Sequence, residues 1–303
     1  MKTAWVFPGQ ASQYVGMTSD FRQSSAEAAD FIRQADRVLG FPISDIMIAG
    51  PEDQLKQTEI TQPAIFIHSL LVARFLKGEF HAVAGHSLGE YSALCAAGVF
   101  DFETGLKLVR LRGELMQKAG TDNPGTMAAV VGATPDAVAE ACREASSAGI
   151  VQPANFNSPG QIVISGSVDG VRRAMEIAKT KGAKIVKELV VSGAFHSPLM
   201  ASASEKLGHA LQTTEFKTPS VAVYTNVTAE PVTDPATLKS LSLKQLTSPV
   251  LWENSVVNMS RDGIGRFVEV GPGKVLQGLI KRTVTDAVCL GVDKFSELEG
   301  ATA

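Results

Sequence analysis

Residues 80–98 read FHAVAGHSLGEYSALCAAG, and residues 85–89 within this stretch fit the pattern G-x-S-x-G. The apolar run before the pattern predicts a buried strand at 80–85, because it is short and ends in glycine. The small and apolar residues that follow predict a buried helix at 87–98. A serine on a sharp turn between a strand and a helix is typical of a nucleophile elbow. The stretch therefore predicts an α/β fold in which Ser87 is a nucleophile.

Alternating strands and helices extend on both sides of this elbow. Before it, the sequence predicts a strand at 3–7 and helices at 24–39 and 63–78. After residue 193 it predicts strands at 221–226 and 266–270, with helices at 252–260 and 274–283. Strands that alternate with helices favour a parallel sheet covered by helices. We therefore expect an α/β-hydrolase-like large domain.

A different pattern fills the middle of the chain. It begins after the turn-rich residues 121–125, TDNPG. From there to residue 192 the predicted order is strand, helix, strand, strand, helix, strand, which is typical of a ferredoxin-like unit. We therefore expect residues 124–192 to form a ferredoxin-like subdomain, inserted into a large domain made of residues 1–123 and 193–303.

The composition is that of an ordinary globular enzyme. The chain has 303 residues, of which 45% are hydrophobic and 19% charged, and its formal net charge is -3. This balance gives no reason to expect a nucleic acid or an anionic membrane as a partner. The three cysteines are far apart and form no C-x-x-C pair, so neither a disulfide framework nor a metal site is expected. Without a long apolar stretch or an export signal, the sequence predicts a cytoplasmic protein.

A nucleophilic serine needs a base within hydrogen-bond distance. The chain has five histidines, and His196 is the best candidate because it lies in a loop, SGAFHSPLM, between a predicted strand and a predicted helix. His86 adjoins the serine, but successive residues at an elbow point in different directions, so we expect a packing role for it. Acyl transfer also needs donors for an oxyanion. The candidates are the backbone amide of Leu88 and an amide in the loop FPGQ at 7–10.

Several short motifs follow one another along the chain. They are VFPGQASQ at 6–13, TQPAIF at 61–66, GHSLGEYSAL at 85–94, LRG at 111–113, NFNSPGQ at 155–161, SGAFHSPLM at 192–200, SPVLW at 248–252 and EVGPGKVL at 269–276. These motifs occur in the order found in malonyl-CoA:acyl carrier protein transacylases, and the sequence resembles that family over essentially its whole length. The resemblance implies an enzyme that moves malonyl from coenzyme A to the phosphopantetheine thiol of an acyl carrier protein. A malonyl ester of a serine is the implied intermediate, and no cofactor or metal is implied.

The resemblance also implies catalytic roles for individual residues. It makes Ser87 the nucleophile and His196 the base. The backbone amides of Gln10 and Leu88 would form the oxyanion hole, and the backbone carbonyl of Gln245 would hold the histidine. An imidazole held by a neutral carbonyl is a milder base than one held by a carboxylate.

The acyl pocket is implied in the same way. Arg112 would bind the free carboxylate of malonate, for which a permanently charged planar guanidinium is well suited. Positions that line the family's cleft are matched by Gln62, Asn155 and Asn157. Phe195 stands where a phenylalanine accompanies malonyl selection in related polyketide acyltransferases. Ala11 follows FPGQ where many members have glycine, so we expect a change in loop flexibility.

Other functions remain as alternatives. A serine thioesterase or another hydrolase is the remote one, because His196 lies far from the C-terminus, no HGGG loop is present, and a neutral acyl chain has no use for Arg112. A nucleotide site at GPGK is not expected, because Val268 and Val275 replace the glycine and the Ser or Thr of a P-loop. Fatty-acid synthesis is the expected pathway. A free-standing polyketide acyltransferase and a malonate decarboxylase subunit use the same kind of site.

The implied macromolecular partner is an acyl carrier protein, and we expect a monomer. Carrier proteins of this kind are usually acidic, and the segment 171–190 carries more basic than acidic residues. This excess predicts a weak docking surface on the inserted subdomain. Its residues are Arg172, Arg173, Lys184 and Lys187.

Overall fold

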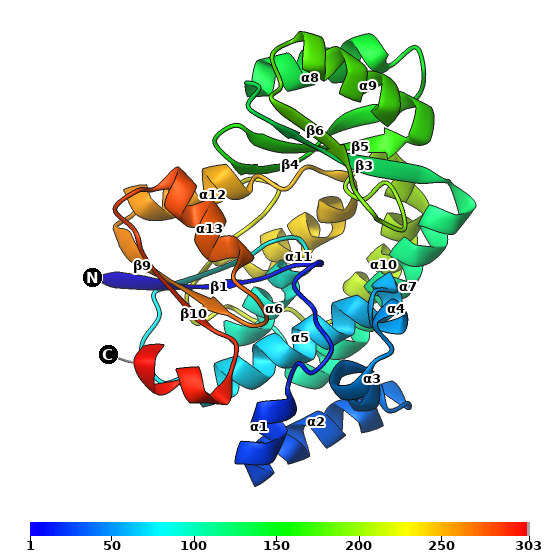
Figure 1. The fold of residues 1–303 in the computed structure, drawn as a ribbon. Helices are drawn as coiled ribbons and strands as arrows, with labels where there is room; N and C mark the ends of the chain where they lie inside the picture. The colour runs from blue at the N-terminus through cyan, green and yellow to red at the C-terminus, as the bar shows by residue number, and fades with distance from the viewer. Residues whose placement is uncertain (302–303) are drawn as a thin grey trace.

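A computed structural model describes residues 1–301. Residues 302–303 of the expected second large-domain segment lie outside the described residues. Figure 1 shows a small sheet with two helices stacked above a larger assembly of sheet and helices, with the N-terminus and the last described residues, 299–301, on one side of the larger assembly.

The large sheet has six strands in the order β10-β9-β1-β2-β7-β8. These strands are β1 (Lys2–Phe7), β2 (Ala82–Gly85), β7 (Ala222–Tyr224), β8 (Pro231–Val232), β9 (Ile264–Val270) and β10 (Val288–Val292). Neighbouring strands are parallel except β7 and β8, which are antiparallel. The expected parallel sheet is therefore confirmed, and a short antiparallel strand closes one edge.

Alternate residues along these strands enter two apolar cores, one on each face of the sheet. Trp5 and Phe7 of β1 belong to the larger core, whereas Ala4 and Val6 belong to the smaller one. The smaller core is covered by α12 (Trp252–Arg261) and α13 (Val275–Thr283). The larger core is built with α1 (Ser19–Ser24), α2 (Ala26–Leu39), α3 (Ile43–Ala49), α4 (Glu52–Leu55), α5 (Thr58–Phe75), α6 (Gly89–Ala96), α7 (Phe102–Asp122), α10 (Ala201–Thr213) and α11 (Pro235–Lys244).

The small sheet is antiparallel, with the order β4-β5-β3-β6. Its strands are β3 (Gly125–Val131), β4 (Val151–Ser158), β5 (Gln161–Ser167) and β6 (Ile185–Glu188). Its helices α8 (Pro135–Ala145) and α9 (Val168–Thr180) lie on the face turned away from the large sheet (Figure 1). This is the expected ferredoxin-like arrangement. The boundaries at residues 124 and 192 remain a prediction.

Two predicted helix starts are wrong. The helix expected at 63–78 begins at Thr58 and contains Pro63. Proline has no N–H, so the carbonyl of Glu59 loses its helical donor, and Arg110 donates to that carbonyl instead at 2.6 Å. The helix expected at 24–39 begins after Ser25, whose side chain accepts from the amide of Ala28.

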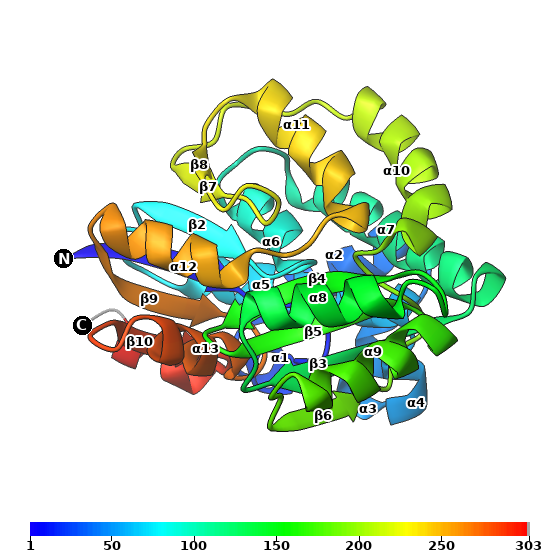
Figure 2. The same cartoon turned by 90° about the horizontal axis from the view of Figure 1, so that it is seen from above.

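The carboxyl ends of the parallel strands β1, β2 and β7 meet at one edge of the large sheet. Loop 8–10 follows β1, Ser87 follows β2, and Asn226 follows β7. Figure 2 shows the β4 edge of the small sheet close to α12 in the large domain. Active sites of open α/β sheets lie outside this edge.

Candidate active site

Ser87 occupies a tight turn between β2 and α6. Its φ of 52° is left-handed, which is uncommon for a residue other than glycine. Two glycines make the turn possible: a Cβ on Gly85 would lie 1.9 Å from the carbonyl carbon of Gly89, and one on Gly89 would lie 2.0 Å from the oxygen of Phe7. The G-x-S-x-G pattern is thus explained by close backbone contacts.

His196 lies beside the serine, as the sequence predicts. Its Nε2 is 2.7 Å from Ser87 Oγ, and its Nδ1 is 2.9 Å from the carbonyl oxygen of Gln245. The carbonyl of Ser248 is a second neighbour of Nδ1, at 3.2 Å. Carbonyl oxygens only accept, so Nδ1 carries the proton and Nε2 is free to accept the serine hydroxyl proton.

The imidazole of His196 is neutral at neutral pH. Its side chain is buried, with 2% of the residue exposed. Burial, together with the positive charge of Arg112, lowers the pKa of His196 from 6.5 to about 3. A base that is already deprotonated can accept a proton without first losing one.

The expected oxyanion donors lie next to the elbow. Within residues 1–301, neither the amide of Gln10 nor that of Leu88 donates a hydrogen bond. Gly9 brings the first loop close, because a Cβ there would be 2.5 Å from the carbonyl oxygen of His86. Two unused amides beside a nucleophile are what an oxyanion needs. Their role remains a prediction.

Arg112 of α7 contacts the same serine from the protein interior. The residue is fully buried, and its Nη2 donates to Ser87 Oγ at 3.1 Å. It also donates to the side-chain oxygens of Gln62, at 2.7 Å, and Gln245, at 3.0 Å. In the described part of the chain Arg112 forms no salt bridge, although Arg110 on the same helix pairs with Glu114. The guanidinium hydrogen-bonds to neutral groups here, and the buried carboxyl of Glu90, whose pKa burial raises to about 7, interacts with its charge without forming a salt bridge. Its charge is therefore available to an incoming carboxylate.

Two residues that the sequence reasoning missed hold the elbow. The side chain of Asn226 accepts from the amide of Ser87 at 2.7 Å and donates to the carbonyl of Gly85 at 2.7 Å. Glu90 is also buried, and it accepts from the amide of Asn226 at 2.5 Å. Burial raises the pKa of Glu90 to about 7. The position of Asn226 at the end of a predicted strand was the available signal.

The remaining predicted pocket residues have different surroundings. Asn157 accepts from His86 Nε2 at 2.8 Å, which gives that histidine a supporting role. Asn155 is buried and forms an isolated parallel β-bridge with Val250. Phe195 is 7% exposed and belongs to the larger apolar core. Its effect on acyl selection remains a prediction.

The predicted docking residues lie away from this site. Arg172 pairs with Glu188 at 3.4 Å, and Arg173 pairs with Glu176 at 2.8 Å. Lys184 precedes β6 and Lys187 lies in it, at the opposite edge of the small sheet from β4. Two of the four cations are thus paired within the subdomain. Carrier docking here remains a prediction.

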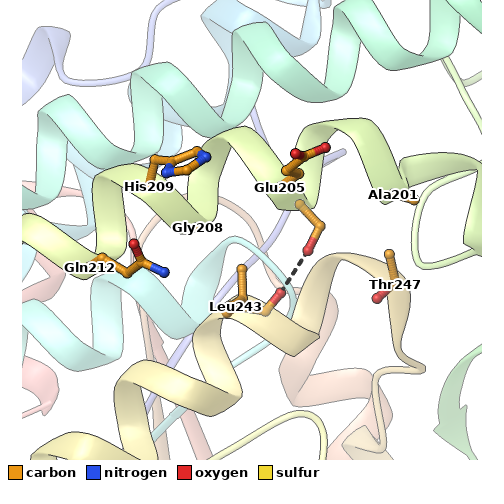
Figure 3. Close-up of a pocket in the computed structure, with 8 residues that line it drawn as sticks. Ala201, Glu205, Gly208, His209, Gln212, Leu243 and Thr247 are labelled. Carbon is orange, nitrogen blue, oxygen red and sulfur yellow. Dashed lines mark hydrogen bonds between the residues drawn. The ribbon is translucent and has the colours of Figure 1, made fainter.

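Other candidate sites offer less chemistry. A groove of about 480 Å³ lies between α10 and α11, where Ser204 Oγ donates to the carbonyl of Leu243 (Figure 3). None of the predicted catalytic or acyl-pocket side chains lines it. No group of three or more metal-ligating side chains occurs in the described residues. Over the same residues, no helix is both long and apolar enough to cross a membrane.

The helix that follows the GPGK loop at 271–274 already has a carboxyl group at its start. Glu269 is fully buried and accepts from the amides of Leu276, at 3.0 Å, and Gln277, at 3.1 Å, at the start of α13. The helix end that binds phosphate in a P-loop is therefore capped by the chain's own carboxylate.

Comparisons with known proteins agree with this geometry. A family model described as "Acyl transferase domain" matches residues 4–298. The malonyl CoA-acyl carrier protein transacylase of Haemophilus influenzae is 41% identical over 297 residues, which cover 96% of this chain and 95% of that protein.

Solved structures agree as well. An acyl carrier protein S-malonyltransferase from Vibrio cholerae is 42% identical, with a TM-score of 0.95 and 99% of both chains covered. A malonyl-transacylase solved in complex with a type II PKS acyl-carrier protein is 38% identical, with a TM-score of 0.96 and the same coverage. The chain belongs to the malonyl-CoA:acyl carrier protein transacylase family.

Proposed function

We propose that this protein transfers malonyl from coenzyme A to the phosphopantetheine thiol of an acyl carrier protein, through a malonyl ester of Ser87. The observation that carries the proposal is the meeting of a neutral base and a buried cation at one hydroxyl. His196 Nε2 lies 2.7 Å and Arg112 Nη2 lies 3.1 Å from Ser87 Oγ. A short diacid presents a thioester carbonyl and a carboxylate close together, which fits these two neighbours.

The first half-reaction forms the ester. As Ser87 Oγ attacks the thioester carbonyl, Nε2 of His196 takes the hydroxyl proton. The amides of Gln10 and Leu88 stabilise the oxyanion. The carbon–sulfur bond then breaks, and the sulfur of coenzyme A leaves with the proton from Nε2. Arg112 holds the distal carboxylate during both steps.

The second half-reaction runs the same steps in reverse with a different thiol. The phosphopantetheine thiol gives its proton to Nε2 of His196 and attacks the ester carbonyl. The bond to Ser87 Oγ breaks, and the serine recovers the proton. Because both ends are thioesters, little driving force is required and ping-pong kinetics are expected. Membership of a transacylase family favours this route over the hydrolase alternative.

We place the reaction in fatty-acid synthesis. We propose that the protein acts in the cytoplasm as a monomer and docks an acyl carrier protein. Polyketide synthesis is the second candidate, because one structural neighbour was solved with the carrier of a type II PKS. The malonate decarboxylase alternative has no comparable observation in its favour. Transfer rates to purified fatty-acid and polyketide carriers discriminate the two pathways.

The test of the intermediate is direct. Incubation with malonyl-CoA should add one malonyl group to the intact protein, and peptide mass mapping should place it on Ser87. Ser87→Ala should give no adduct. His196→Ala should slow loading by about a hundredfold to ten-thousandfold, the usual contribution of a general base. Full loading of Ser87→Ala would refute the assignment.

A further inference from the structure

The catalytic histidine receives a contact from the small subdomain. Nε2 of Gln152, on β4, donates to the backbone carbonyl of His196 at 2.9 Å. No other donor to this carbonyl occurs within residues 1–301. The partner also fixes the orientation of the Gln152 amide, because a carbonyl can pair only with its NH₂ group.

The same strand holds the segment that orients the imidazole. The amide of Val250 donates to the carbonyl of Ala154 at 2.8 Å, and the amide of Phe156 donates to the carbonyl of Val250 at 2.9 Å. This pairing fixes the chain two residues after Ser248, whose carbonyl lies 3.2 Å from His196 Nδ1. Strand β4 therefore supports the base on two sides.

His196 needs this support because its backbone is strained. Its φ of 58° lies in the left-handed region, which residues other than glycine rarely adopt. Such conformations persist only where the surroundings over-determine them. A hydrogen bond to the carbonyl of the strained residue acts directly on that conformation, whereas the bonds to Nδ1 act on the ring.

We propose that Gln152 is a positioning residue for the catalytic base. Its amide keeps His196 in the left-handed conformation that places Nε2 2.7 Å from Ser87 Oγ. Gln152 acts through the histidine and does not take part in the proton transfer. The proposal rests on the function proposed above, in which His196 is the base.

The test replaces Gln152 with methionine, a residue of nearly equal size, and makes the same substitution at a control glutamine. Gln152→Met keeps the length of the side chain and removes the donor. We expect it to lower the first-order rate constant of malonyl loading about tenfold, since small displacements of a catalytic group carry costs of this order or more. The malonyl-CoA concentration that gives half the maximal rate should not change. Gln161→Met on β5 is the matched control. Within residues 1–301 the side chain of Gln161 accepts one hydrogen bond, from exposed Arg282, so this variant should load normally.

Gln152→Glu adds a readout that a packing role would not produce. At pH 7.5 its carboxylate cannot donate and repels the carbonyl of His196. When the carboxyl is protonated, its O–H can donate to the same carbonyl. Relative to the unsubstituted protein at each pH, loading by Gln152→Glu should recover as the pH falls from about 7.5 to about 5.5, a range that includes carboxyls whose pKa burial has raised. Gln152→Met should show no recovery.

Two results would overturn the positioning role: normal loading by Gln152→Met, or equal and pH-independent loss in Gln152→Met and Gln152→Glu. His196→Ala separates this failure from failure of the proposed function. If His196→Ala is inactive while Gln152→Met loads normally, only the positioning role fails. If His196→Ala itself loads normally, the assignment of the base fails as well.

Discussion

Replacing Arg112 with alanine should convert a malonyl-selective site into one that no longer distinguishes malonyl from acetyl. The guanidinium is fully buried, and its Nη2 lies 3.1 Å from the nucleophilic oxygen of Ser87. A hydrogen bond to a charged group contributes about 1.5–3 kcal/mol. At about 1.4 kcal/mol for each factor of ten, loss of the clamp should slow malonyl loading by about tenfold to a hundredfold.

Acetyl loading should behave differently. Acetyl has no carboxylate to pair with Arg112, so the substitution removes no favourable contact with this acyl group. Its rate should hold or rise. Arg112→Lys should recover only part of the malonyl rate, because an ammonium cannot reproduce the planar fork that binds a carboxylate.

The assay is the rate of covalent loading from malonyl-CoA and from acetyl-CoA, followed by intact mass. The informative quantity is the ratio of the two rates, which is insensitive to a fraction of unfolded protein. Lys107→Ala is the control on the same helix, because Lys107 is exposed and its salt bridge with Glu103 lies at the surface. If malonyl and acetyl loading by Arg112→Ala fall by the same factor, the arginine is structural and the substrate assignment loses its physical basis.

Three further results are expected. In a Glu90→Gln variant, which removes a buried group with a pKa of about 7, malonyl loading at malonyl-CoA concentrations far below saturation should stay level from pH 8 to pH 5. Under these conditions the rate reports the free enzyme, in which the pKa of His196 is about 3, so the imidazole keeps its proton-accepting form over this range. An acid limb near pH 6.5 would contradict this. Ala11→Gly should raise the free energy of unfolding, measured in urea, by about 0.5–1 kcal/mol. Ala11 has a left-handed φ of 83°, and relief of this backbone strain by glycine should exceed the added entropy of the unfolded chain. A loss of stability would show that Ala11 is not strained. Glu269→Gln should lower the same free energy by about 1–3 kcal/mol, since one amide oxygen cannot replace a carboxylate that caps α13, and an unchanged urea midpoint would show that the cap contributes little.

The features that the sequence predicted correctly have local causes. The turn at Ser87 requires glycine at 85 and 89 because backbone atoms approach within 2.0 Å of where a Cβ would lie. The spacing of the two glycines around the serine is therefore enough to predict the turn. The order of strands and helices at 125–188 likewise follows from short periodic segments and turns, and it was enough to indicate the ferredoxin-like unit.

The features that it could not predict depend on partners distant in sequence. A proline normally marks the start of a helix, yet α5 continues through Pro63 because Arg110 bonds the freed carbonyl. Arg112, two residues later, looks equally solvated in the sequence but is fully buried. Asn226 and Gln152 carry no motif of their own, and their importance appears only when β7 and β4 are brought beside the elbow and the base.

The buried arginine also links recognition of the acyl group to the strength of the base. The positive charge of Arg112 is one cause of the low pKa of His196, after burial. General-base efficiency falls when the pKa of the base lies far below the working pH. A bound malonyl carboxylate cancels part of that positive field, so it should raise the pKa of the imidazole toward its useful range. Acetyl leaves the field intact. The preference for malonyl should therefore appear in the rate of loading at saturating substrate as well as in binding, because the substrate's own charge improves the base that activates Ser87.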